Sequence, residues 1–426
     1  MRDMRESGVT WIGEIPTDWS LIRFKDKYTN IKEVAKERSV EFERLALTLN
    51  GVIKRPKDDS EGLQPKEFDG YQILRENDFV FKMIDLQNIS TSRVGLSPYT
   101  GLVSPAYIRF SPKEPNQYNQ FVYYYLMSMY YNCVYNNLGG NGVRSALNGR
   151  DMGEFVIPYP SESEQREISA FLDKKCNQVN ALIENVQAQI EKLKAYKQSV
   201  ITEVVIKGLD PTVPMKDSGV DRLDRIPMHW RIVKQTMLTT RIGDGLHGTP
   251  EFDDSSNIFF INGNNLGEKY ITVRENTKSV LPSEYEKYRL DLNDRTLLIS
   301  LNGTIGSISR YNGEIVVFGK SAGYIIVKNN INIDYLSYYL QTRCVKEIFE
   351  LSFAGTTIKN LSLETLRNLR VCVPPHEEQE AIVVYLDEKC SQIDRLIAIK
   401  QAKIEKLEQY KKSLIYEYVT GKKEMS

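Results

Sequence analysis

The chain has 426 residues, of which 41% are hydrophobic, and its 56 Lys and Arg balance 56 Asp and Glu. This length is sufficient for two or three domains that each bury a core of their own. The balanced charge excludes an argument from the whole chain for a polyanionic partner, so any nucleic-acid surface must be local.

The cysteines and histidines are few and scattered. Five cysteines form no CxxC pair and are odd in number, which is typical of reduced thiols. Three histidines without a Cys/His cluster argue against a structural zinc site. No apolar run reaches the roughly 18 residues of a membrane span, and charged residues follow Met1. We therefore expect a cytoplasmic protein with no membrane partner and no metal site.

A short motif near the N-terminus occurs twice. "MRESGVTWIGEIPTDW" at Met4–Trp19 returns as "MKDSGVDRLDRIPMHW" at Met215–Trp230, with Met, Ser-Gly-Val, Ile-Pro and Trp at matching places. The match indicates an internal duplication. We expect the final tryptophans to anchor the motif against a neighbouring surface, with core packing favoured over base stacking. Where the copies differ, at Trp11 and Arg222, we expect a weak constraint.

Each copy of the motif leads into a segment of mixed character, 21–159 and 232–373. Short apolar runs bounded by Gly, Asn or Asp predict strands at "DFVFKMI" from Asp78, "TLLISL" from Thr296, "EIVVF" from Glu314 and "YIIV" from Tyr324. Helical patterns begin near Asn119 and Ile333, and each leads into a Gly-rich turn, "GGNGVRSALN" or "AGTTIKNLS". The two segments are expected to share a scaffold and to differ in the residues that line it.

A long helix is predicted after each mixed segment. The stretch "EQREISAFLDKKC" from Glu164 matches "EQEAIVVYLDEKC" from Glu378, and about half of the positions in the two predicted helices are identical. Apolar residues recur at alternating spacings of four and three, which is the seam of a coiled coil. The seam is broken at Lys197, where the neighbouring Tyr196 is expected to take its place. Gly208 and Gly421 are typical helix stops, and about 40 residues make a rod roughly 60 Å long.

A seam of this period needs a partner helix, and the other copy is a candidate within the chain. Two equivalent helices related by an approximate twofold axis would pack antiparallel. The alternatives are that each helix packs on its own domain or binds another protein, and Lys400 in place of Val186 departs from the symmetric picture.

The predicted fold class is α+β with an internal pseudo-twofold repeat. Two mixed α/β domains, at 1–163 and 209–377, are joined by long helices at 164–208 and 378–422 that form an antiparallel coiled coil.

The motifs of common enzyme classes do not fit this chain. "GDGLHG" from Gly243 satisfies G-x-G-x-x-G, but Pro250 follows where a helix should open. "GEIVVFGKS" from Gly313 resembles a phosphate-binding loop but places a strand between its glycines. Signatures of metal-dependent nucleases, amino-methyltransferases and hydrolases are absent. His229, His247 and His376 are expected to be surface or loop residues, so the sequence favours a binding protein without catalytic residues.

Several stretches together resemble the specificity subunits of type I restriction-modification systems. They are the repeated "SGV…IP..W" motif, the helix start "EQ..I..FLD" at Glu164–Asp173 with its counterpart at Glu378–Asp387, and the helix end "I.KL..YK.S.I". "DGLHGTPEF" from Asp244 and "NGTIGSI" from Asn302 also look like elements of the family's recognition domains. The resemblance covers essentially the whole chain, including the order of segment, helix, segment and helix.

The resemblance implies a non-catalytic DNA reader. Each mixed domain would be a target recognition domain for one half of a split, asymmetric sequence in double-stranded DNA. The helices would set the spacing and dock two modification subunits, which use S-adenosylmethionine to methylate adenine. A restriction subunit, a motor-nuclease that uses ATP and Mg, would join to cut unmethylated DNA. The chain itself would bind no cofactor.

Polar side chains in loops are the candidates for DNA contacts, because amide and basic groups read base edges and basic or hydroxyl groups bind phosphates. They are Asn141, Arg144, Ser145 and Asn148 in the first half and His247, Thr249, Asn264, Asn265, Thr357 and Lys359 in the second. Arg144 and Lys359 follow their Gly-rich turns at corresponding positions, which suggests a shared phosphate contact. For any one of these residues, the alternative is a capped turn that supports the preceding helix. A basic loop at Lys54, Arg55 and Lys57 is a further candidate, although such loops are usually only solvated.

Two other function classes remain open at this point. One is an interaction scaffold, with two protein-binding domains on a coiled-coil rod and no DNA role. The other is a standalone enzyme, which the missing motifs oppose.

Overall fold

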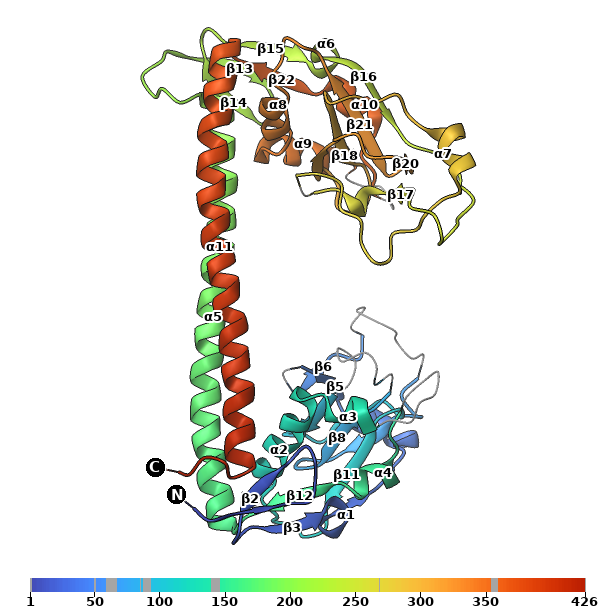
Figure 1. Ribbon diagram of the computed structural model, residues 1–426, viewed down its shortest axis with the longest axis vertical. Helices are drawn as coiled ribbons and strands as arrows, with labels where there is room; N and C mark the ends of the chain where they lie inside the picture. Colours follow the sequence, from blue (N-terminus) through green and yellow to red (C-terminus); the bar gives the residue numbers. More distant parts are fainter. Residues whose placement is uncertain are drawn as a thin grey trace. The chain divides into compact units, whose positions relative to one another are not determined.

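The computed structural model describes residues 2–49, 51–58, 67–84, 86, 93–138, 146–267, 269–353 and 359–425 (Figure 1). The chain divides into two compact units: unit 1 comprises Met1–Val186 and Ala402–Ser426, and unit 2 comprises Gln187–Gln401. Each unit holds one mixed domain and one part of each long helix.

The described part of the first domain contains two four-stranded sheets. The central sheet has the antiparallel order β4 (Tyr28–Asn30), β11 (Ile108–Pro112), β8 (Phe79–Lys82), β9 (Arg93–Leu96). The second sheet has the order β6 (Gly51–Arg55), β5 (Arg44–Thr48), β10 (Gly101–Val103), β7 (Gln72–Leu74), and β5 and β10 run parallel. The other elements are β3 (Ser20–Arg23) paired with β12 (Val156–Tyr159), α1 (Phe24–Lys27), η1 (Lys36–Glu41), α2 (Gln120–Tyr131), α3 (Val134–Leu138) and α4 (Gly149–Gly153).

The second domain repeats the central sheet. The strands β16 (Thr239–Asp244), β21 (Ala322–Val327), β18 (Thr296–Ser300) and β19 (Ile308–Arg310) are antiparallel in the same order as β4, β11, β8 and β9. A parallel pair, β17 (Phe259–Ile261) with β20 (Val316–Phe318), takes the place of β5 and β10 in chain order. The other elements are β15 (Arg231–Lys234) paired with β22 (Arg370–Val373), α6 (Gln235–Leu238), η2 (Gly263–Asn265), α7 (Pro282–Tyr288), α8 (Ile333–Leu340), α9 (Arg343–Ser352) and α10 (Leu363–Asn368).

The repeated strand order confirms the shared scaffold that the sequence predicts. The strands β8, β18 and β20 fall within predicted apolar runs, and β21 contains the run from Tyr324 but begins two residues earlier, at Ala322. Each predicted helical stretch contains a break, between α2 and α3 in the first domain and between α8 and α9 in the second. In the first break Cys133 has a φ of 55°, a left-handed conformation that ends a helix.

The core of the first domain is aromatic. Phe24, Phe79, Phe81 and Phe110 are at most 1% exposed, and their ring centroids lie between 4.8 and 6.2 Å apart where they pair. These residues are buried because β8 lies between two neighbours in the central sheet and α1 covers it. The rings contribute both apolar area and edge-to-face contacts.

The long helices extend over nearly the predicted ranges. The helix α5 spans Glu162–Lys207 and α11 spans His376–Val419, so each begins slightly before the predicted start. Gly208 and Gly421 follow them with φ values of 80° and 69°, which confirms both glycines as helix stops. The boundaries of the compact units fall within the helices, whereas the sequence placed its divisions at the helix ends.

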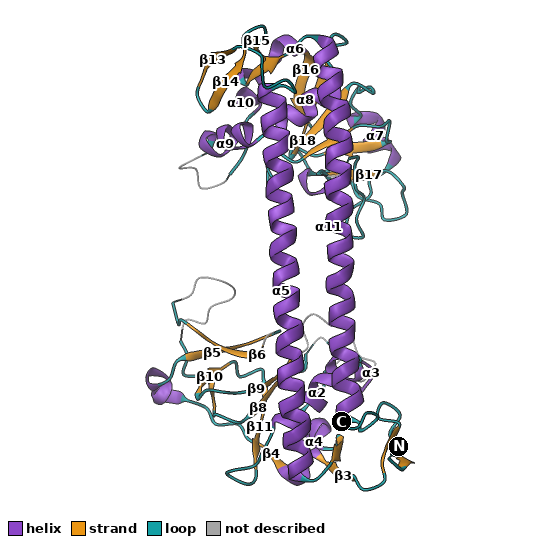
Figure 2. Ribbon diagram, turned by 90° about the vertical axis from the view of Figure 1, so that its left-hand side faces the viewer, coloured by secondary structure: helices purple, strands orange, loops and turns teal. Residues whose placement is uncertain are grey.

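Within each unit the two long helices lie side by side and run antiparallel (Figure 2). In unit 1, Lys411 Nζ donates to Asn180 Oδ1 at 2.8 Å, and the rings of Phe171 and Tyr418 lie 4.6 Å apart. From the second of these contacts to the first, the residue number rises along α5, from 171 to 180, and falls along α11, from 418 to 411, as it does in an antiparallel pair. The expected pairing of the two copies is therefore present, while a regular coiled-coil geometry stays a prediction.

In unit 2, polar residues bridge the seam. Tyr196 is 50% exposed, so the prediction that it takes the seam is wrong. Lys197 keeps the seam position because its ammonium contacts Asp394 of α11, with Nζ 2.6 Å from Oδ2. Lys400, which departs from the apolar pattern, donates to Gln189 at 2.5 Å.

The repeated motif forms a hairpin in each unit, β1 (Met4–Glu6) with β2 (Glu14–Pro16) and β13 (Met215–Val220) with β14 (Leu223–Pro227). Each hairpin leads to a buried tryptophan, since Trp19 and Trp230 are 2% and 0% exposed. The indole N–H of Trp19 donates to Glu164 at 3.0 Å and that of Trp230 to Glu378 at 2.9 Å. Core packing of both tryptophans is confirmed.

The hairpins also contact the ends of the long helices. A Cβ on Gly421 would lie 2.4 Å from Pro16, and a Cβ on Gly208 would lie 3.3 Å from Trp230. In each unit the motif therefore connects the first turn of one long helix with the glycine that ends the other.

The expectation of a weak constraint at Trp11 is wrong. Its indole N–H donates to the Tyr125 hydroxyl at 3.3 Å, and its ring packs against the aromatic core of unit 1. Its counterpart Arg222 instead occupies a left-handed position at the tip of the other hairpin, with a φ of 65°.

A buried ion pair joins the two sheets of the first domain. The side chains of Arg109 on β11 and Asp78 are both 2% exposed, with Nε 2.6 Å from Oδ2. Arg109 also donates to the carbonyl of Ile73 on β7 at 2.5 Å and lies 3.2 Å from Glu33. Arg109, which lies on a strand of the central sheet, thus contacts β7 of the second sheet.

Asp78→Asn is expected to lower the free energy of unfolding of unit 1 by about 3 kcal/mol, because it leaves Arg109 buried without its closest counter-charge. Urea unfolding measures the loss, and hydrogen exchange of β8 and β11 assigns it to unit 1. The control is Glu41→Gln, which breaks an exposed pair with Arg38 and should cost less than about 1 kcal/mol. Equal losses in the two variants would contradict a special role for the buried pair.

Trp230→Phe keeps an aromatic ring but removes the indole donor to Glu378, and we expect it to cost about 1–2 kcal/mol. Hydrogen exchange should increase in β13, β14 and the end of α5. The matched variant Trp19→Phe should increase exchange in β1 and β2 instead. Increases of the same size in both hairpins for either variant would show that the two contacts are not local to their units.

Candidate nucleic-acid interface

Four turns of unit 2 meet at one edge of the second domain. They follow the carboxyl ends of β16, β17, β18 and β20, and they comprise residues 245–247, 262–264, 302–304 and 319–321. The backbone N–H of Leu246 donates to Phe318 at 2.7 Å, and that of Gly263 donates to Ser321 Oγ at 3.0 Å. These hydrogen bonds connect turns that are far apart in the sequence.

Glycines permit this close approach. A Cβ on Gly245 would lie 2.1 Å from the Phe318 carbonyl oxygen, and a Cβ on Gly263 would lie 2.4 Å from Ser300 Oγ. A Cβ on Gly319 would lie 2.5 Å from Asn262 Oδ1. The backbone of each of these glycines is therefore packed closely against a neighbouring turn or strand, which gives the outward side chains of the turns defined positions.

The exposed side chains on this edge are those of His247, Asn264, Thr304 and Lys320. The sequence predicted His247 and Asn264 as contact residues and missed Thr304 and Lys320. Lys320 lies in the "GKS" of the rejected phosphate-loop match, where a glycine directly after a strand was the available signal. We call these four residues the polar edge of unit 2.

Two other predicted residues of this half take different places. Thr249 is exposed beside the polar edge. Asn265 is only 3% exposed, and its side chain donates to the Thr272 carbonyl at 3.0 Å and to Thr277 Oγ1 at 2.9 Å. Asn265 cannot reach DNA without losing these bonds, so its prediction as a contact residue is wrong.

The first-half candidates fall mostly outside the described residues, where Asn141, Arg144 and Ser145 lie, as does Thr357 of the second half. Asn148 caps α4, because its side chain accepts from the backbone N–H groups of Arg150 and Asp151 at 2.8 and 3.1 Å. The alternative weighed for such residues, a capped turn, is therefore the observed role of Asn148. Its side chain is nevertheless exposed.

The residues flanking Arg144 and Lys359 occupy equivalent places. The backbone N–H of Leu147 donates to the Met83 carbonyl at 3.2 Å, just beyond β8, and that of Leu361 donates to the Leu301 carbonyl at 2.9 Å, just beyond β18. In both domains the chain that follows the Gly-rich turn thus returns to the end of the same strand of the central sheet.

The basic loop of the first domain has internal partners. Lys54 pairs with Glu43 at 2.6 Å, and Lys57 donates to the Ser39 carbonyl at 2.7 Å. The hydrogen bond from Lys54 to Glu43 raises the pKa of Lys54. These contacts favour a structural role for the loop.

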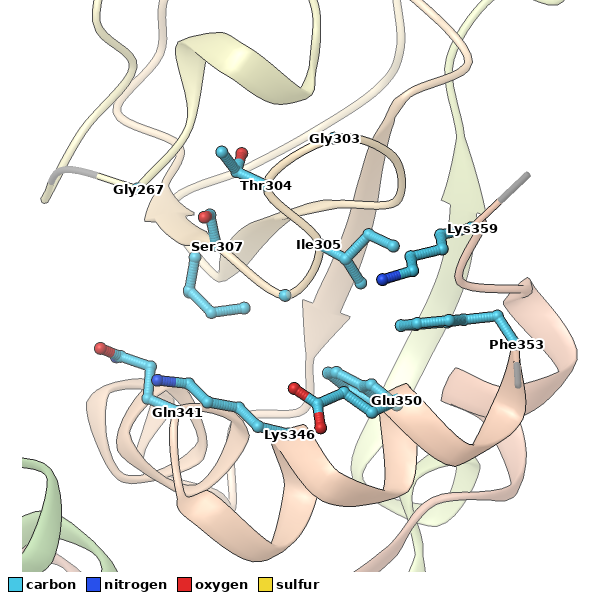
Figure 3. Close-up of a pocket in the computed structure, with 13 residues that line it drawn as sticks. Gly267, Gly303, Thr304, Ile305, Ser307, Gln341, Lys346, Glu350, Phe353 and Lys359 are labelled. Atoms are coloured by element: carbon cyan, nitrogen blue, oxygen red, sulfur yellow. The ribbon is translucent and has the colours of Figure 1, made fainter. Parts of the chain in front are cut away.

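A pocket of about 840 Å³ lies on unit 2 between the turn 303–308 and α9 (Figure 3). Lys346 and Glu350 enter it from α9, and Lys359 enters from the chain beyond that helix. The ring of Phe353 and the side chain of Ile305 form apolar walls. The pocket thus combines two cations and one carboxylate with apolar surface.

Tyrosine–aspartate contacts fix each domain on its long helix. The hydroxyl of Tyr124 on α2 donates to Asp173 at 2.5 Å, and that of Tyr338 on α8 donates to Asp387 at 2.6 Å. Burial and the neighbouring carboxylate together raise the pKa of both tyrosines, so both hydroxyls remain donors. The two contacts occupy equivalent places in the repeat.

The three histidines lie at the surface, as the sequence predicts. His229, His247 and His376 are exposed, and each lies beside a carboxylate, at 2.7, 2.7 and 3.5 Å. The five cysteines are free thiols, and burial raises the pKa of Cys372 to about 12. In the described part of the chain no group of three or more His, Cys, Asp or Glu side chains is placed to hold a metal ion. Over the same residues, no helix has the length and apolar character required to cross a membrane.

Comparisons with known proteins agree over nearly the whole chain. Residues 27–192 and 249–409 match the family model described as type I restriction modification DNA specificity domain. The putative type I restriction enzyme MjaX specificity subunit of Methanocaldococcus jannaschii is 23% identical, over 97% of this chain and 95% of its own. The MjaVIII specificity subunit of the same organism is 24% identical, over 96% and 93%.

A solved structure, from work on complex assembly and conformational transition of the type I R-M system, has the same fold. Its TM-score is 0.65 at 16% identity, and the match covers 95% of this chain and 98% of that one. Since the family model matches both mixed domains and parts of both long helices, the chain belongs to the type I restriction-modification DNA specificity family.

Proposed function

We propose that the chain is the sequence-specific DNA-binding subunit of a type I restriction-modification complex, and that each mixed domain reads one half of a bipartite, asymmetric target. The observation that carries this proposal is a repeated central sheet whose turns bear unlike residues. After β16 comes the sequence Gly-Leu-His at 245–247, whereas Ile-Lys-Glu at 31–33 follows β4. Two domains with the same central sheet and different turn residues suit two half-sites of different sequence. A homodimer presents two identical surfaces and would read the same sequence twice.

The proposed contacts in unit 2 come from the polar edge and its surroundings. Asn264 and His247 carry donors and acceptors suited to base edges, and Lys320 carries a charge suited to a phosphate. Thr249, Thr304 and Thr357 add hydroxyl groups. In unit 1 the proposed contacts are Asn141, Arg144, Ser145 and Asn148.

The proposed partners are two modification subunits and the restriction subunits of the same system. The modification subunits would use S-adenosylmethionine to methylate adenine, and the restriction subunits would use ATP and Mg. The specificity subunit contributes binding and spacing and no catalytic step. Its proposed location is the cytoplasm, beside the DNA.

Duplicated apolar side chains on the long helices support docking of two identical subunits. Leu182 and Leu396 occupy equivalent positions of the repeat and are 50% and 48% exposed. Tyr196 and Tyr410 are likewise equivalent and are 50% and 52% exposed. Each unit therefore presents one such Leu and one such Tyr, which we call a Leu–Tyr site, and two equal sites suit two copies of one partner.

Exchanging residues 232–373 for the corresponding segment of a relative is expected to change one half of the methylated DNA motif and to leave the other half unchanged. Methylated-base sequencing of cells that express the chain with its partners measures both halves. Deletion of the gene is the control and should remove the whole split motif. Persistence of the motif after deletion would refute the proposed function.

Leu182→Glu with Tyr410→Glu should remove one modification subunit from the complex, because each charge would be buried in an apolar contact. The pair Leu396→Glu with Tyr196→Glu should remove the other. Analytical ultracentrifugation of the assembled complex measures the mass. The control Ile399→Glu alters a side chain that is 66% exposed but has Asn185 at the equivalent position. Loss of a subunit in the control, or in neither pair, would contradict the Leu–Tyr sites.

A test of DNA duplex binding distinguishes the proposed function from the alternative, an interaction scaffold with no DNA role. The chain with its methyltransferase partner should bind a duplex that contains the motif more tightly than a scrambled duplex. The salt concentration must be stated, because phosphate contacts release counterions.

A further inference from the structure

We propose that the pocket between the turn 303–308 and α9 of unit 2 binds a phosphate of the DNA backbone, with Lys359 and Lys346 as its cations. This inference rests on the proposed function and adds a contact that is independent of base sequence.

Lys359 is available for such a contact. Its side chain is exposed, and within the described ranges no hydrogen bond or ion pair occupies its ammonium. Figure 3 shows the ammonium directed into the pocket beside Ile305. The hydrogen bond from Leu361 to Leu301, at 2.9 Å, fixes the chain directly after Lys359 against the end of β18. Among the described residues, the tip of Lys359 thus has no partner, while the chain near its base is held.

Lys346 lies on the other side of the pocket and has a neutral partner. Its Nζ donates to Gln198 Oε1 at 2.6 Å, and the amide nitrogen of Gln198 donates to the Gln341 carbonyl at 2.7 Å. Desolvation lowers the pKa of Lys346, and no carboxylate of the described chain forms an ion pair with it. A phosphate in the pocket would supply the missing counter-charge.

The turn 303–308 forms the wall of the pocket that faces α9. Gly303 and Gly306 have left-handed φ values of 71° and 79°, and a Cβ on Gly306 would lie 3.2 Å from the Phe349 ring. Thr304 is exposed between them. The backbone N–H groups of Gly306 and Ser307 donate to the carbonyls of Ser300 and Thr304 at 2.9 and 3.1 Å, and the Thr304 hydroxyl donates to the Gly263 carbonyl at 3.4 Å. The turn therefore fixes the shape of this wall, and the lysines supply the groups that would bind a phosphate.

The chemistry favours a phosphate over a base edge. A lysine ammonium is a compact charge without the fixed fork that pairs with guanine. The apolar walls formed by Ile305 and Phe353 suit the deoxyribose next to a phosphate. Glu350 is the acidic side chain of the pocket, and no ion pair joins it to either lysine. Its negative charge repels a phosphate, so its removal should raise DNA affinity, whereas removal of a lysine should lower it.

The test measures binding of a target duplex and a scrambled duplex by the full chain with its methyltransferase partner, over a series of salt concentrations. Lys359→Gln is expected to weaken the binding of both duplexes by the same factor, about tenfold. It should also reduce the slope of log affinity against log salt by about 0.9. The control Lys287→Gln removes the same charge from an exposed lysine on α7 and should leave the slope unchanged.

Glu350→Gln is expected to strengthen the binding of both duplexes a few-fold, since it removes a negative charge that repels the phosphate. Lys359 and Glu350 carry the test because both are exposed, whereas Lys346 also contacts α5 and its replacement can disturb folding. A second arm adds inorganic phosphate at matched ionic strength. Displacement of the duplex by phosphate beyond the effect of chloride would assign the pocket to free phosphate and overturn the proposal.

Two further results would overturn it. Altered discrimination at one base pair with an unchanged salt slope would make Lys359 a base reader, and unchanged affinity and slope in both variants would remove the pocket from the DNA contact. A wild-type complex that binds neither duplex refutes the proposed function itself, whereas normal wild-type binding with unaffected variants refutes this inference alone.

Discussion

The contact between an indole N–H and a glutamate, present once in each unit, is the constraint on which the rest of the structure depends. Trp19 and Trp230 bind Glu164 and Glu378 in the first turns of the long helices and pack near the glycines that end them. Within each unit, one hairpin contacts the first turn of one long helix and the glycine that ends the other, so the two helix segments of that unit have little freedom to slide past each other. The polar contacts across the seam, such as Lys197 with Asp394, then follow from that register.

Residues that hold the frame recur in both halves, whereas the residues of the outward turns of the two mixed domains do not. The Tyr124–Asp173 and Tyr338–Asp387 contacts fix each domain on a long helix, and the central sheets have the same strand order. The strand ends opposite this framework carry turns of unrelated sequence. Phosphate contacts position a protein on DNA and base contacts give specificity, so a constant frame allows the turns to change without moving the rest of the domain.

The features with a regular period were predictable from the sequence. The four-three spacing located both long helices, and the apolar runs located β8, β18, β20 and β21, because burial imposes these patterns locally. Features that depend on a partner far away in the chain were not predictable. Lys197 stays in the seam because of Asp394 on the other helix, and Arg109 is buried because Asp78 and the Ile73 carbonyl meet it. The same reason explains Asn265 and Asn148, since an amide in a turn has the same sequence signature whether it faces DNA, caps a helix or satisfies a neighbouring backbone.

The division of the chain into units has a consequence for its synthesis. Unit 2 is one continuous stretch, Gln187–Gln401, whereas unit 1 needs both the first 186 residues and Ala402–Ser426. Gly421, against which Pro16 and Trp19 pack, follows the whole of unit 2 in chain order. Unit 1 therefore completes its structure only after unit 2 has been synthesised, and until then its hairpin and the face of its α5 segment that will meet α11 are open to chaperones and to the neighbouring chains of a polysome.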